Sequence, residues 1–290
     1  MIIPCPLPRV IPRPAPAWVA AISGPSLDPD AAAYIAAVEA ADGQALEPAI
    51  RIAYDEFICG CKDDTFDITN GDVVAGSTFR NWDRFKASCI LAGARTLSGA
   101  LVPLVGSAPA NTNNNFVTAD YVRATGLKGD GSTKWLNSNR NNNADPQDNF
   151  SGGAWIQENA SGGANRAFIG AGVNEVGAFN IARRSDGSDF IVRNRSSVLF
   201  ISSPNAPQTG LVGCSRSKAD AFQFRNGEFQ TTHNLVSEVP FNRNISVFGR
   251  NLAAESDARL QFYWVGEALD LAALNARLAT LTAAIATALA

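Results

Sequence analysis

Residues 179–193 read FNIARRSDGSDFIVR, and residues 222–229 read FQFRNGEF. In both stretches, two short runs rich in aromatic and β-branched residues flank a polar turn that contains glycine. The turn is Ser185–Ser188 in the first stretch and Asn226-Gly227 in the second. Asn-Gly favours the primed two-residue turns that join antiparallel strands. Both stretches therefore predict β-hairpins, and they decide the fold class.

Similar short apolar segments, separated by proline, glycine and asparagine, surround the two hairpins from about residue 101 onward. Strands this short and this closely spaced are typical of an antiparallel sandwich, whereas βαβ units need long helical segments between the strands. The other strands that we expect lie at 154–157, 167–169, 197–201, 209–215, 245–248 and 260–265.

The segment before the sandwich has helical periodicity. Asp28 is suited to cap a helix that has Pro29 in its first turn, and apolar residues then recur at helical spacing until Gly43. Further helices are expected at 46–57 and from 79 or 82 to 91, with a polar loop over 62–76.

The last twenty residues also predict a helix, which Asp270 can cap. Its apolar residues follow a spacing of three and four, and they are Leu271, Leu274, Leu278, Leu281 and Ile285. This run is too short to predict a coiled coil. We expect a C-terminal helix that packs on the sandwich or on a neighbouring subunit.

The first 27 residues have prolines at positions 4, 6, 8, 12, 14, 16 and 25. Because proline fixes φ and cannot donate to a strand ladder, this segment predicts an extended arm without a core of its own. A plain spacer is the alternative, but large apolar side chains favour an arm that docks in a partner's groove. The expected docking residues are Ile2, Ile3, Cys5, Leu7, Val10, Ile11 and Trp18.

The composition excludes several classes of function. The net charge is −3 and no run is rich in lysine or arginine, so nucleic-acid binding has no electrostatic support. Prolines interrupt the N-terminal apolar residues, so no signal peptide is expected, and no uninterrupted apolar stretch predicts membrane insertion. Charged residues make up only 18% of the chain, which indicates either a surface partly buried against partners or a large β core.

Catalytic and metal-binding patterns are weak. His233 is the single histidine and no G-x-S-x-G motif accompanies it, so we interpret it as a lone surface residue. The acidic loop around Asp67 lacks the spacing of a calcium loop. The acidic residues of the β region have no distinctive setting for glycoside hydrolysis. They are Glu158, Glu175, Asp186, Asp189 and Glu228. We therefore expect no enzymatic activity, no cofactor and no metal.

The Asn-rich segment 137–149 is the candidate saccharide site, because amide side chains both donate and accept hydrogen bonds. Two flanking tryptophans would stack on a sugar ring. The candidate contacts are Trp135, Asn139, Asn141, Asn142, Asn143 and Trp155. The alternative interpretation is a structured loop with its own Asx turns and tryptophans buried in the core.

The chain has five cysteines, so at least one has no partner within the chain. Cys5 lies in the arm, far from any core, and is a candidate for an intermolecular disulfide. Cys59 or Cys61 is a candidate to pair with Cys89 or with a partner.

Three sequence phrases carry a resemblance to a known family: YIAAVEAADGQALE (34–47), ILAGARTLSGALVPLVG (90–106) and DYVRATGLKGDGSTKWLNSNRNNN (120–143). The FGRN segment (248–251) and YWVGEAL (263–269) belong to the same pattern. The chain resembles bacteriophage structural proteins, often tail-fibre or receptor-binding proteins, that carry a concanavalin A-like (laminin G-like) jelly-roll domain.

The resemblance implies a mainly β fold, an antiparallel two-sheet jelly-roll sandwich with a small N-terminal helical module and a C-terminal helix. The expected organisation is a docking arm over 1–27, a helical module and linker over 28–114, a lectin-like sandwich over 115–269 and a helix over 270–290. The resemblance also implies a virion component that forms a homo-oligomer, and we expect a trimer.

The leading hypothesis is a phage tail-fibre protein, made in the host cytoplasm. Its arm docks on the tail or baseplate, and its sandwich faces host-surface glycan. A capsid decoration or cement protein is the first alternative, in which the arm clamps capsid subunits. A glycan-degrading depolymerase is the second.

Overall fold

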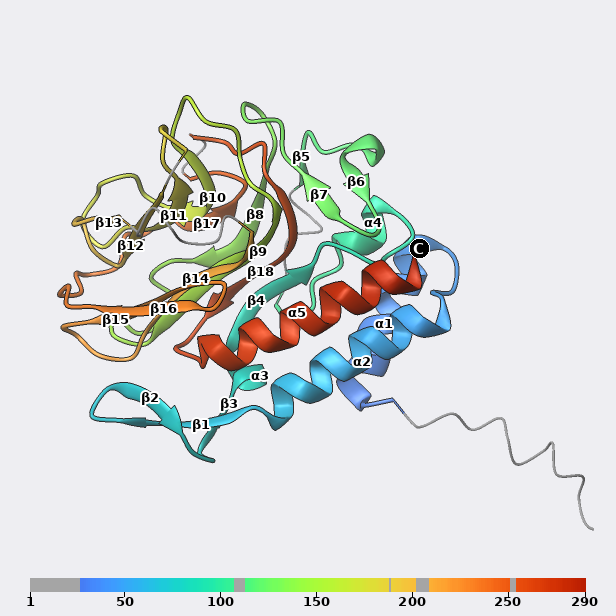
Figure 1. The fold of residues 1–290 in the computed structure, drawn as a ribbon, viewed down its shortest axis with the longest axis horizontal. Helices are drawn as coiled ribbons and strands as arrows, with labels where there is room; N and C mark the ends of the chain where they lie inside the picture. Colours follow the sequence, from blue (N-terminus) through green and yellow to red (C-terminus); the bar gives the residue numbers. More distant parts are fainter. Residues whose placement is uncertain (1–26, 107–112, 188, 202–208, 251–253) are drawn as a thin grey trace, which may run out of the picture.

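The computed structural model describes residues 27–106, 113–187, 189–201, 209–250 and 254–290 (Figure 1). The expected docking residues of the arm therefore lie outside the described residues. Within the described part, two large antiparallel sheets and one small one carry the fold, and helices lie on one side of them. The prediction of a mainly β, antiparallel fold with N-terminal helices and a C-terminal helix is confirmed.

One sheet contains seven described strands in the order β13-β12-β11-β10-β17-β8-β5. Every neighbouring pair in it is antiparallel. The strands are β5 (Asn113–Asn114), β8 (Trp135–Asn141), β10 (Arg166–Ala171), β11 (Phe179–Arg183), β12 (Phe190–Asn194), β13 (Phe200–Ile201) and β17 (Asn244–Val247).

The second sheet contains eight described strands, seven of them in the order β16-β15-β14-β9-β18-β7-β6, and β4 also pairs with β18. The strands are β4 (Phe85–Ile90), β6 (Tyr121–Val122), β7 (Gly126–Lys128), β9 (Phe150–Glu158), β14 (Gly210–Arg216), β15 (Phe222–Asn226), β16 (Phe229–His233) and β18 (Arg259–Gly266). Both predicted hairpins are present, as β11–β12 and β15–β16.

The hydrophobic core lies between the two sheets. The rings of Phe150 on β9 and Phe179 on β11 meet edge to face, with centroids 4.8 Å apart. Gly152 lies beside them, because a Cβ at this position would lie 2.7 Å from the Phe179 ring. Even-numbered positions of β9 and odd-numbered positions of β11 therefore point inward, and their neighbours point to the outer faces of the sandwich.

Two helices cover the outer face of the eight-stranded sheet, α2 (Pro48–Asp63) and α5 (Leu271–Ala288) (Figure 1). Phe57 of α2 meets Phe262 of β18 with ring centroids 5.6 Å apart. The predicted cap of α5 is present, since the Asp270 carboxylate accepts hydrogen bonds from the backbone N–H groups of Ala272 and Ala273. By length and apolar composition α5 could also span a membrane, but here its leucine face is buried against the body.

The N-terminal helix α1 (Pro29–Asp42) begins and ends as the sequence predicts. The Asp28 side chain accepts from the Asp30 N–H, and Gly43 closes the helix with a φ of 70°. This left-handed conformation suits glycine, which has no Cβ to clash. A short helix α4 (Leu97–Ala100) packs against α1.

Two predictions for residues 62–91 are wrong. The expected polar loop over 62–76 contains the end of α2 and a hairpin of β1 (Thr65–Thr69) and β2 (Asp72–Ala75), which β3 (Phe79–Arg80) extends. The expected helix ending at Leu91 is one turn, α3 (Asn81–Arg84), followed by β4. Pairing with β18 overrides local helical periodicity here, because it satisfies the backbone groups of β4 within the sheet.

Candidate functional site

A polar row crosses the outer face of the seven-stranded sheet, on the side away from the helices. Strand register places five residues in line, one from each of five neighbouring strands. We call them the outer-face row: Arg193 (β12), Asn180 (β11), Gly170 (β10), Ser246 (β17) and Asn137 (β8). The next row along the strands contains the inward residues Val192, Ile181, Ile169, Val247 and Leu136, all of which are buried apolar core.

Two buried arginines meet at Asn180. Arg250, in the segment after β17, donates from Nη1 to Asn180 Oδ1 at 3.4 Å. Arg193 is the cross-strand partner of Asn180. Both arginines are more than nine-tenths buried, and Arg250 Nε has no hydrogen-bond partner. The Asn180 amide also donates to the carbonyl of Gly172, at 3.0 Å, which ties the following loop to the row.

Glu175 supplies the negative charge beside this arginine pair. Burial opposes its ionisation, but hydrogen bonds from the backbone N–H groups of Val173 and Asn174 and the charge of Arg250 outweigh burial and lower the pKa of Glu175. Burial lowers the pKa of Arg250, and the charge of Arg193 lowers it further. The site therefore combines two confined cations with one ionised carboxylate.

The two tryptophans predicted to stack on a sugar ring lie on opposite sides of the sandwich. Trp135 is half-buried at the start of β8, two residues before Asn137, so it shares the outer face of the seven-stranded sheet. Trp155 of β9 is on the outer face of the other sheet, where it packs against the core and lies opposite Phe262. One saccharide ring cannot contact both, and only Trp135 lies near the outer-face row.

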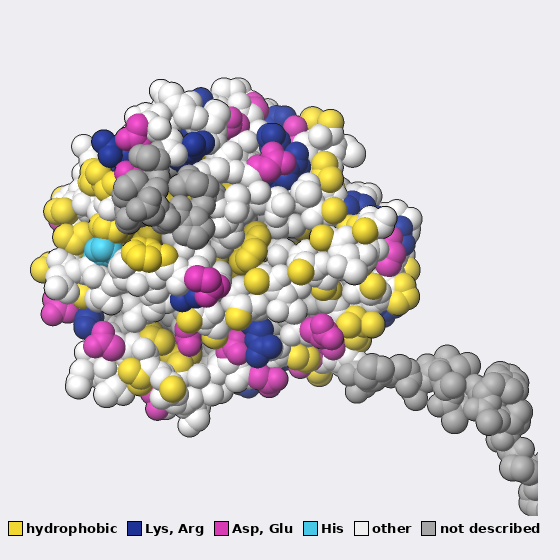
Figure 2. Space-filling model, viewed as in Figure 1, with side chains coloured by type: hydrophobic (Ala, Val, Ile, Leu, Met, Phe, Trp, Pro, Cys, Tyr) yellow, Lys and Arg dark blue, Asp and Glu magenta, His cyan; other side chains and the backbone are white. Residues whose placement is uncertain are grey.

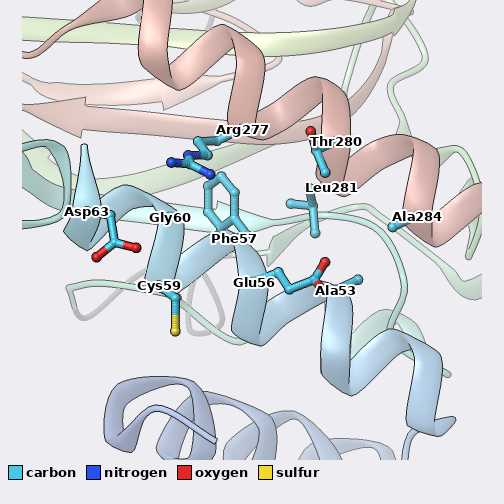
Figure 3. Close-up of a pocket in the computed structure, with 10 residues that line it drawn as sticks. All are labelled: Ala53, Glu56, Phe57, Cys59, Gly60, Asp63, Arg277, Thr280, Leu281 and Ala284. Atoms are coloured by element: carbon cyan, nitrogen blue, oxygen red, sulfur yellow. The ribbon is translucent and has the colours of Figure 1, made fainter.

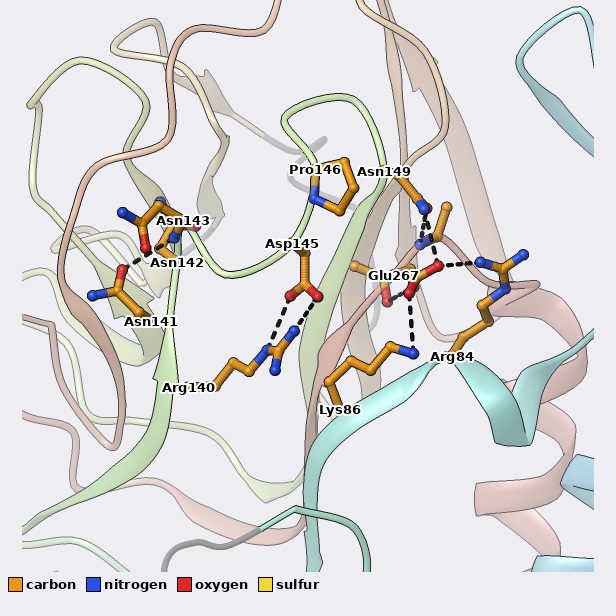
Figure 4. Close-up of polar contacts among 12 residues, drawn as sticks. Arg84, Lys86, Arg140, Asn141, Asn142, Asn143, Asp145, Pro146, Asn149 and Glu267 are labelled. Atoms are coloured by element: carbon orange, nitrogen blue, oxygen red, sulfur yellow. Dashed lines mark hydrogen bonds and ion pairs between the residues drawn. The ribbon is translucent and has the colours of Figure 1, made fainter.

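The Asn-rich segment is a structured loop in which the asparagines have different surroundings (Figure 4). Asn142 is fully buried and donates to the carbonyls of Gly177 and Phe241. Asn141 binds Asn242 through its amide nitrogen and the Asn143 N–H through its oxygen. Asn139 and Asn143 are exposed. A saccharide contact is therefore a prediction that remains open only for the exposed members, because Asn142 is committed to the fold.

Arg195 holds this loop in place. It is fully buried and donates to the carbonyls of Asn142, Asp145 and Pro146. Its guanidinium carbon lies 4.2 Å from the centroid of the Phe150 ring. Burial lowers the pKa of Arg195 to about 10. Arg195 thus binds three backbone carbonyls, whereas Arg193 donates to one, that of Ser197, and Arg250 donates to the Asn180 side chain.

The candidate disulfide cysteines are free thiols in the described structure. Cys61 and Cys89 are fully buried, and burial raises the pKa of both. Cys89 Sγ donates to the carbonyl of Ala100 at 3.1 Å. Neither Cys59 nor Cys61 is bonded to Cys89 in the described structure. Cys59 is partly exposed on α2, so pairing of Cys59 with a partner stays a prediction, as does the role of Cys5, which lies outside the described residues.

The remaining candidates have local structural partners. His233 stacks on Phe200 with ring centroids 3.4 Å apart, and burial lowers its pKa. In the acidic loop, the Asp67 carboxylate accepts from the backbone N–H groups of Ser77 and Thr78. The described ranges contain no group of three metal-ligating side chains. In the view of Figure 2, lysines, arginines and acidic residues are mixed across the surface.

Sequence reasoning missed the outer-face row, although its signal is present in the hairpin that decides the fold. Asn180 and Arg193 are the polar residues that alternate with the buried apolar positions of FNI and IVR. Alternation predicts only which side chains leave the core. The register that aligns them, and the approach of Arg250 from a distant segment, are tertiary facts.

No family model matches the chain, and no curated protein matches its sequence. Among solved structures, it is similar to the enzymatically active domain of bacteriophage CBA120 tailspike protein 2, at 10% identity over 50% of this chain and 25% of that chain, with a TM-score of 0.35. It is also similar to a Trypanosoma rangeli sialidase, at 8% identity over 81% of this chain and 38% of that chain, with a TM-score of 0.44.

A further match is the full-length tailspike protein 2 of the same kind, an Escherichia coli O157:H7 bacteriophage protein, at 9% identity over 50% of this chain and 23% of that chain, with a TM-score of 0.32. The chain spans between 23% and 38% of the length of these structures. The expectation that the chain is not an enzyme is contradicted by these matches, since they include an enzymatically active tailspike domain and a sialidase. That expectation is withdrawn.

Proposed function

We propose that the chain is a phage tail component that acts on host-surface glycan, and that the outer face of the seven-stranded sheet is its saccharide-binding face. The resemblance of its sequence to phage structural proteins supports the place in a tail. The observation that carries the glycan proposal is the outer-face row with its two buried arginines. The helices lie on the other side of the sandwich (Figure 1), and on this side Asn180, Arg193 and Ser246 are buried by loop segments of the chain.

The row offers the two kinds of contact that saccharides need. Trp135 lies beside the row, two residues before Asn137 on β8, and its half-buried ring offers an aromatic surface on which a sugar ring would stack. Asn137 follows on the same face, about 7 Å further along β8, which is within the length of one sugar ring. Amide and guanidinium groups next to it match hydroxyl and acidic oxygens.

The charge of the row indicates which glycans it favours. Arg193 and Arg250 are confined in a buried setting where the field of a cation is poorly screened. Glu175 neutralises one of these two charges. A saccharide that carries a carboxylate or phosphate group would supply the second negative charge, so we propose an acidic envelope polysaccharide as the ligand class.

Cleavage requires more than binding, because glycoside hydrolysis uses one ionised and one protonated carboxyl group. Glu175, with its lowered pKa, fits the ionised role of a base or nucleophile. Among the described residues, the carboxyl groups whose pKa departs from its ordinary value all have it lowered. The proposal thus assigns the binding role to this face and the ionised role to Glu175, and a cleaving enzyme would also need a protonated carboxyl group.

The test is to incubate the purified full chain with acidic envelope polysaccharide and to measure both binding and chain length. Trp135→Ala and Arg250→Gln are expected to weaken binding at least about tenfold, which corresponds to about 1.4 kcal/mol. Trp155→Ala is the matched aromatic control on the opposite side, and Lys128→Gln is the charge control at an exposed site. Each variant is first checked for a wild-type unfolding transition.

Shortened polysaccharide that disappears in Glu175→Gln would identify a depolymerase. Binding without shortening would identify a receptor-binding tail component. Binding that is unchanged in both Trp135→Ala and Arg250→Gln would contradict the proposed face, and an absence of any binding to host polysaccharide would contradict the proposed function.

A further inference from the structure

Both large sheets end on the same side of the sandwich, and we call this side the strand edge. Among the described strands, the seven-stranded sheet ends at β13 and the eight-stranded sheet ends at β16. The two end strands contact each other, because the Phe200 ring stacks on His233 with centroids 3.4 Å apart. The Phe200 ring also lies 5.7 Å from the Phe224 ring of β15. Figure 1 shows the strand edge on the left, away from the C-terminal end of α5.

Exposed apolar side chains gather at the strand edge. Of the eleven large apolar residues that are exposed in the described structure, seven lie on β13, on β16 or in the loops beside them. In Figure 2 apolar side chains surround the histidine on this side of the molecule. A concentration of this kind on a folded body marks an interaction site. The seven residues are Val176, Val198, Leu199, Ile201, Phe229, Val236 and Val239.

The valines of this set come from separate loops that one carboxylate ties together. Glu238 accepts hydrogen bonds from the backbone N–H groups of Gly177 and Ser197. Val176, Val198 and Val239 are the immediate chain neighbours of these three residues. They therefore lie on one surface, which continues through Leu199 to β13.

The outer side of β16 presents unpaired backbone groups in a regular order. Asn226 and Phe229 are cross-strand partners on either side of a two-residue turn. Such a closing pair exchanges both of its hydrogen bonds, so every second residue from Phe229 bonds toward β15. The N–H and C=O groups of Gln230 and Thr232 therefore point away from the sheet, and no described strand pairs with them. Groups arranged in this way form a template for another strand.

The sequence of the strand edge lacks the residues that commonly keep an end strand unpaired, which are lysine, proline and inward-pointing charges. Residues 229–237 read FQTTHNLVS, and residues 197–201 read SVLFI. Neither stretch contains a lysine, an arginine, a carboxylate or a proline. A two-fold contact brings residues close to copies of themselves, where a charge would meet a like charge. An uncharged end strand therefore suits a second copy of this chain.

We infer that two copies of the chain pair through β16, antiparallel, about a two-fold axis at Thr231. In this register Gln230 of each copy faces Thr232 of the partner subunit, and their free backbone groups form four hydrogen bonds. Phe229 faces His233 of the partner subunit and extends the aromatic cluster in which His233 stacks on Phe200. The eight-stranded sheets of the two copies become one continuous sheet.

The surroundings of β16 fit this register. Glu228, the nearest carboxylate, has a side chain that is 89% exposed, and it faces Asn234 of the partner subunit. The two copies of Glu228 lie six residues apart along the strands, or about 20 Å, so they do not repel each other strongly. A specific interface buries roughly 800 Å² on each partner, which is more than one strand pair supplies. Leu199 and Ile201, beside β16, supply further apolar area.

The groove between α2 and α5 is a less suitable surface for a second copy (Figure 3). Its volume is about 280 Å³, and the side chains along it include Glu56, Asp63 and Arg277. Arg277 is already paired with the Asp64 carboxylate at 2.9 Å. Charged side chains thus line this groove. Ile52, which is 50% exposed on α2, serves as an apolar control position outside the proposed contact.

Sedimentation of the purified full chain at micromolar concentration tests the pairing, under reducing conditions that exclude disulfide-linked dimers. We expect a dimer, because a two-fold contact closes on itself. Phe229→Lys places a charge against the aromatic cluster and is expected to weaken dimerisation at least about a hundredfold, or about 2.7 kcal/mol. Ile52→Lys should sediment as the wild type does. A monomeric wild type, the trimer that the family resemblance implies, or a dimer that Phe229→Lys leaves intact would overturn the inference.

Thr232→Pro tests the backbone pairing and spares the hydrogen bonds within the chain. Proline removes an N–H group that points away from the sheet, so the bonds between β16 and β15 remain. We expect a monomer with the circular dichroism spectrum of the wild type. A dimer of wild-type affinity in this variant would show that the two copies do not pair through β16.

Cysteine cross-linking tests the register independently of dimer strength. In a background with Cys5→Ser and Cys59→Ser, Thr231→Cys places two thiols opposite each other across the axis. This pair is not hydrogen-bonded, and its Cα atoms lie about 4.5 Å apart, within the range of a disulfide. Copper phenanthroline should therefore give a dimer on a non-reducing gel. Gln230→Cys, the matched control, faces Thr232 of the partner subunit and should not cross-link. Equal cross-linking of both variants, or of neither, would contradict the two-fold register.

Discussion

The outer face of the eight-stranded sheet carries Phe262 and Trp264 beneath α2 and α5, whereas the outer face of the seven-stranded sheet carries Asn180 and Arg193. Both faces belong to one sandwich with one core, so the core does not account for the difference. A sheet face with apolar outward residues must pack against another element, and here helices cover it. The polar outward residues of the other sheet are also buried, but beside Arg250 of a loop and not beneath a described helix (Figure 1).

The two buried arginines Arg195 and Arg250 make different kinds of contact. The Arg195 guanidinium donates hydrogen bonds to three backbone carbonyls and thereby holds the Asn-rich loop in its conformation. Arg250 makes one long hydrogen bond to a side chain and has an unpartnered Nε. The Nε of Arg195 is also unpartnered, so the two arginines differ in their other bonds: Arg195 makes three to backbone carbonyls, and Arg250 makes one long bond to a side chain.

The largest effect on stability is expected on the helix-covered face. Trp264 is fully buried, donates from Nε1 to Ser151 Oγ at 3.1 Å, and packs over Gly153 and Gly213. Trp264→Ala should lower the free energy of unfolding by about 3–5 kcal/mol, because it leaves a large cavity. Trp135→Ala, on the other face, should cost less than about 1 kcal/mol. Denaturant unfolding of both variants measures the contrast, and equal losses would refute it.

The next effect concerns the clamp of the Asn-rich loop. Arg195→Met keeps the length of the side chain but leaves the carbonyls of Asn142, Asp145 and Pro146 without their donor. We expect a loss of about 3 kcal/mol in the free energy of unfolding. Hydrogen exchange of the loop amides should rise in the same variant. A wild-type exchange pattern would show that the loop does not depend on Arg195.

Local chemistry allowed much of this fold to be predicted. The Asn226-Gly227 turn, the Asp28 and Asp270 caps and the Gly43 terminus each depend on residues close in sequence, and all lie where the sequence places them. The secondary-structure predictions are wrong where pairing with a distant segment determines the conformation. Phe85–Ile90 has helical spacing but pairs with β18, about 175 residues later in the chain. Periodicity carries no information about such a partner.

The candidate site follows the same division. The sequence draws attention to Trp135 and Trp155 because they flank an unusual loop, but their separation on opposite sides depends on which sheet each strand joins. The convergence of Arg250 on Asn180 spans 70 residues. Only the alternation that turns Asn180 and Arg193 out of the core is visible in the hairpin itself.

A smaller loss of stability is expected at acid pH from Glu267, which contacts Arg84, Lys86 and Asn149 (Figure 4). Burial opposes ionisation of Glu267, but Lys86, Asn149 and Arg84 outweigh it and lower the pKa of Glu267. A lowered pKa contributes stability above the unfolded value of about 4.3, and this is lost as the pH falls through the folded value. As the pH falls from 5 to 3 we therefore expect the stability contributed by this group to be lost progressively.

Glu267→Gln should remove that part of the pH dependence and lower stability at pH 7, as measured by urea unfolding at several pH values. The control is Glu158→Gln, whose pKa is lowered by Lys128 but whose side chain is 47% exposed and therefore screened by solvent. An unchanged acid transition in Glu267→Gln would show that another group at the junction governs it.

The smallest change in the free energy of unfolding is expected for substitution of Arg250. This variant gives the clearest contrast with Arg195. Burial and the charge of Arg193 lower the pKa of Arg250, so the folded state bears a cost for holding this cation. Arg250→Met removes that cost together with one long hydrogen bond, and the free energy of unfolding should change by less than about 1 kcal/mol in either direction. Binding of acidic polysaccharide should nevertheless weaken in the same variant. A loss of stability as large as that of Arg195→Met would make Arg250 a second clamp, and the outer-face row would then be part of the scaffold.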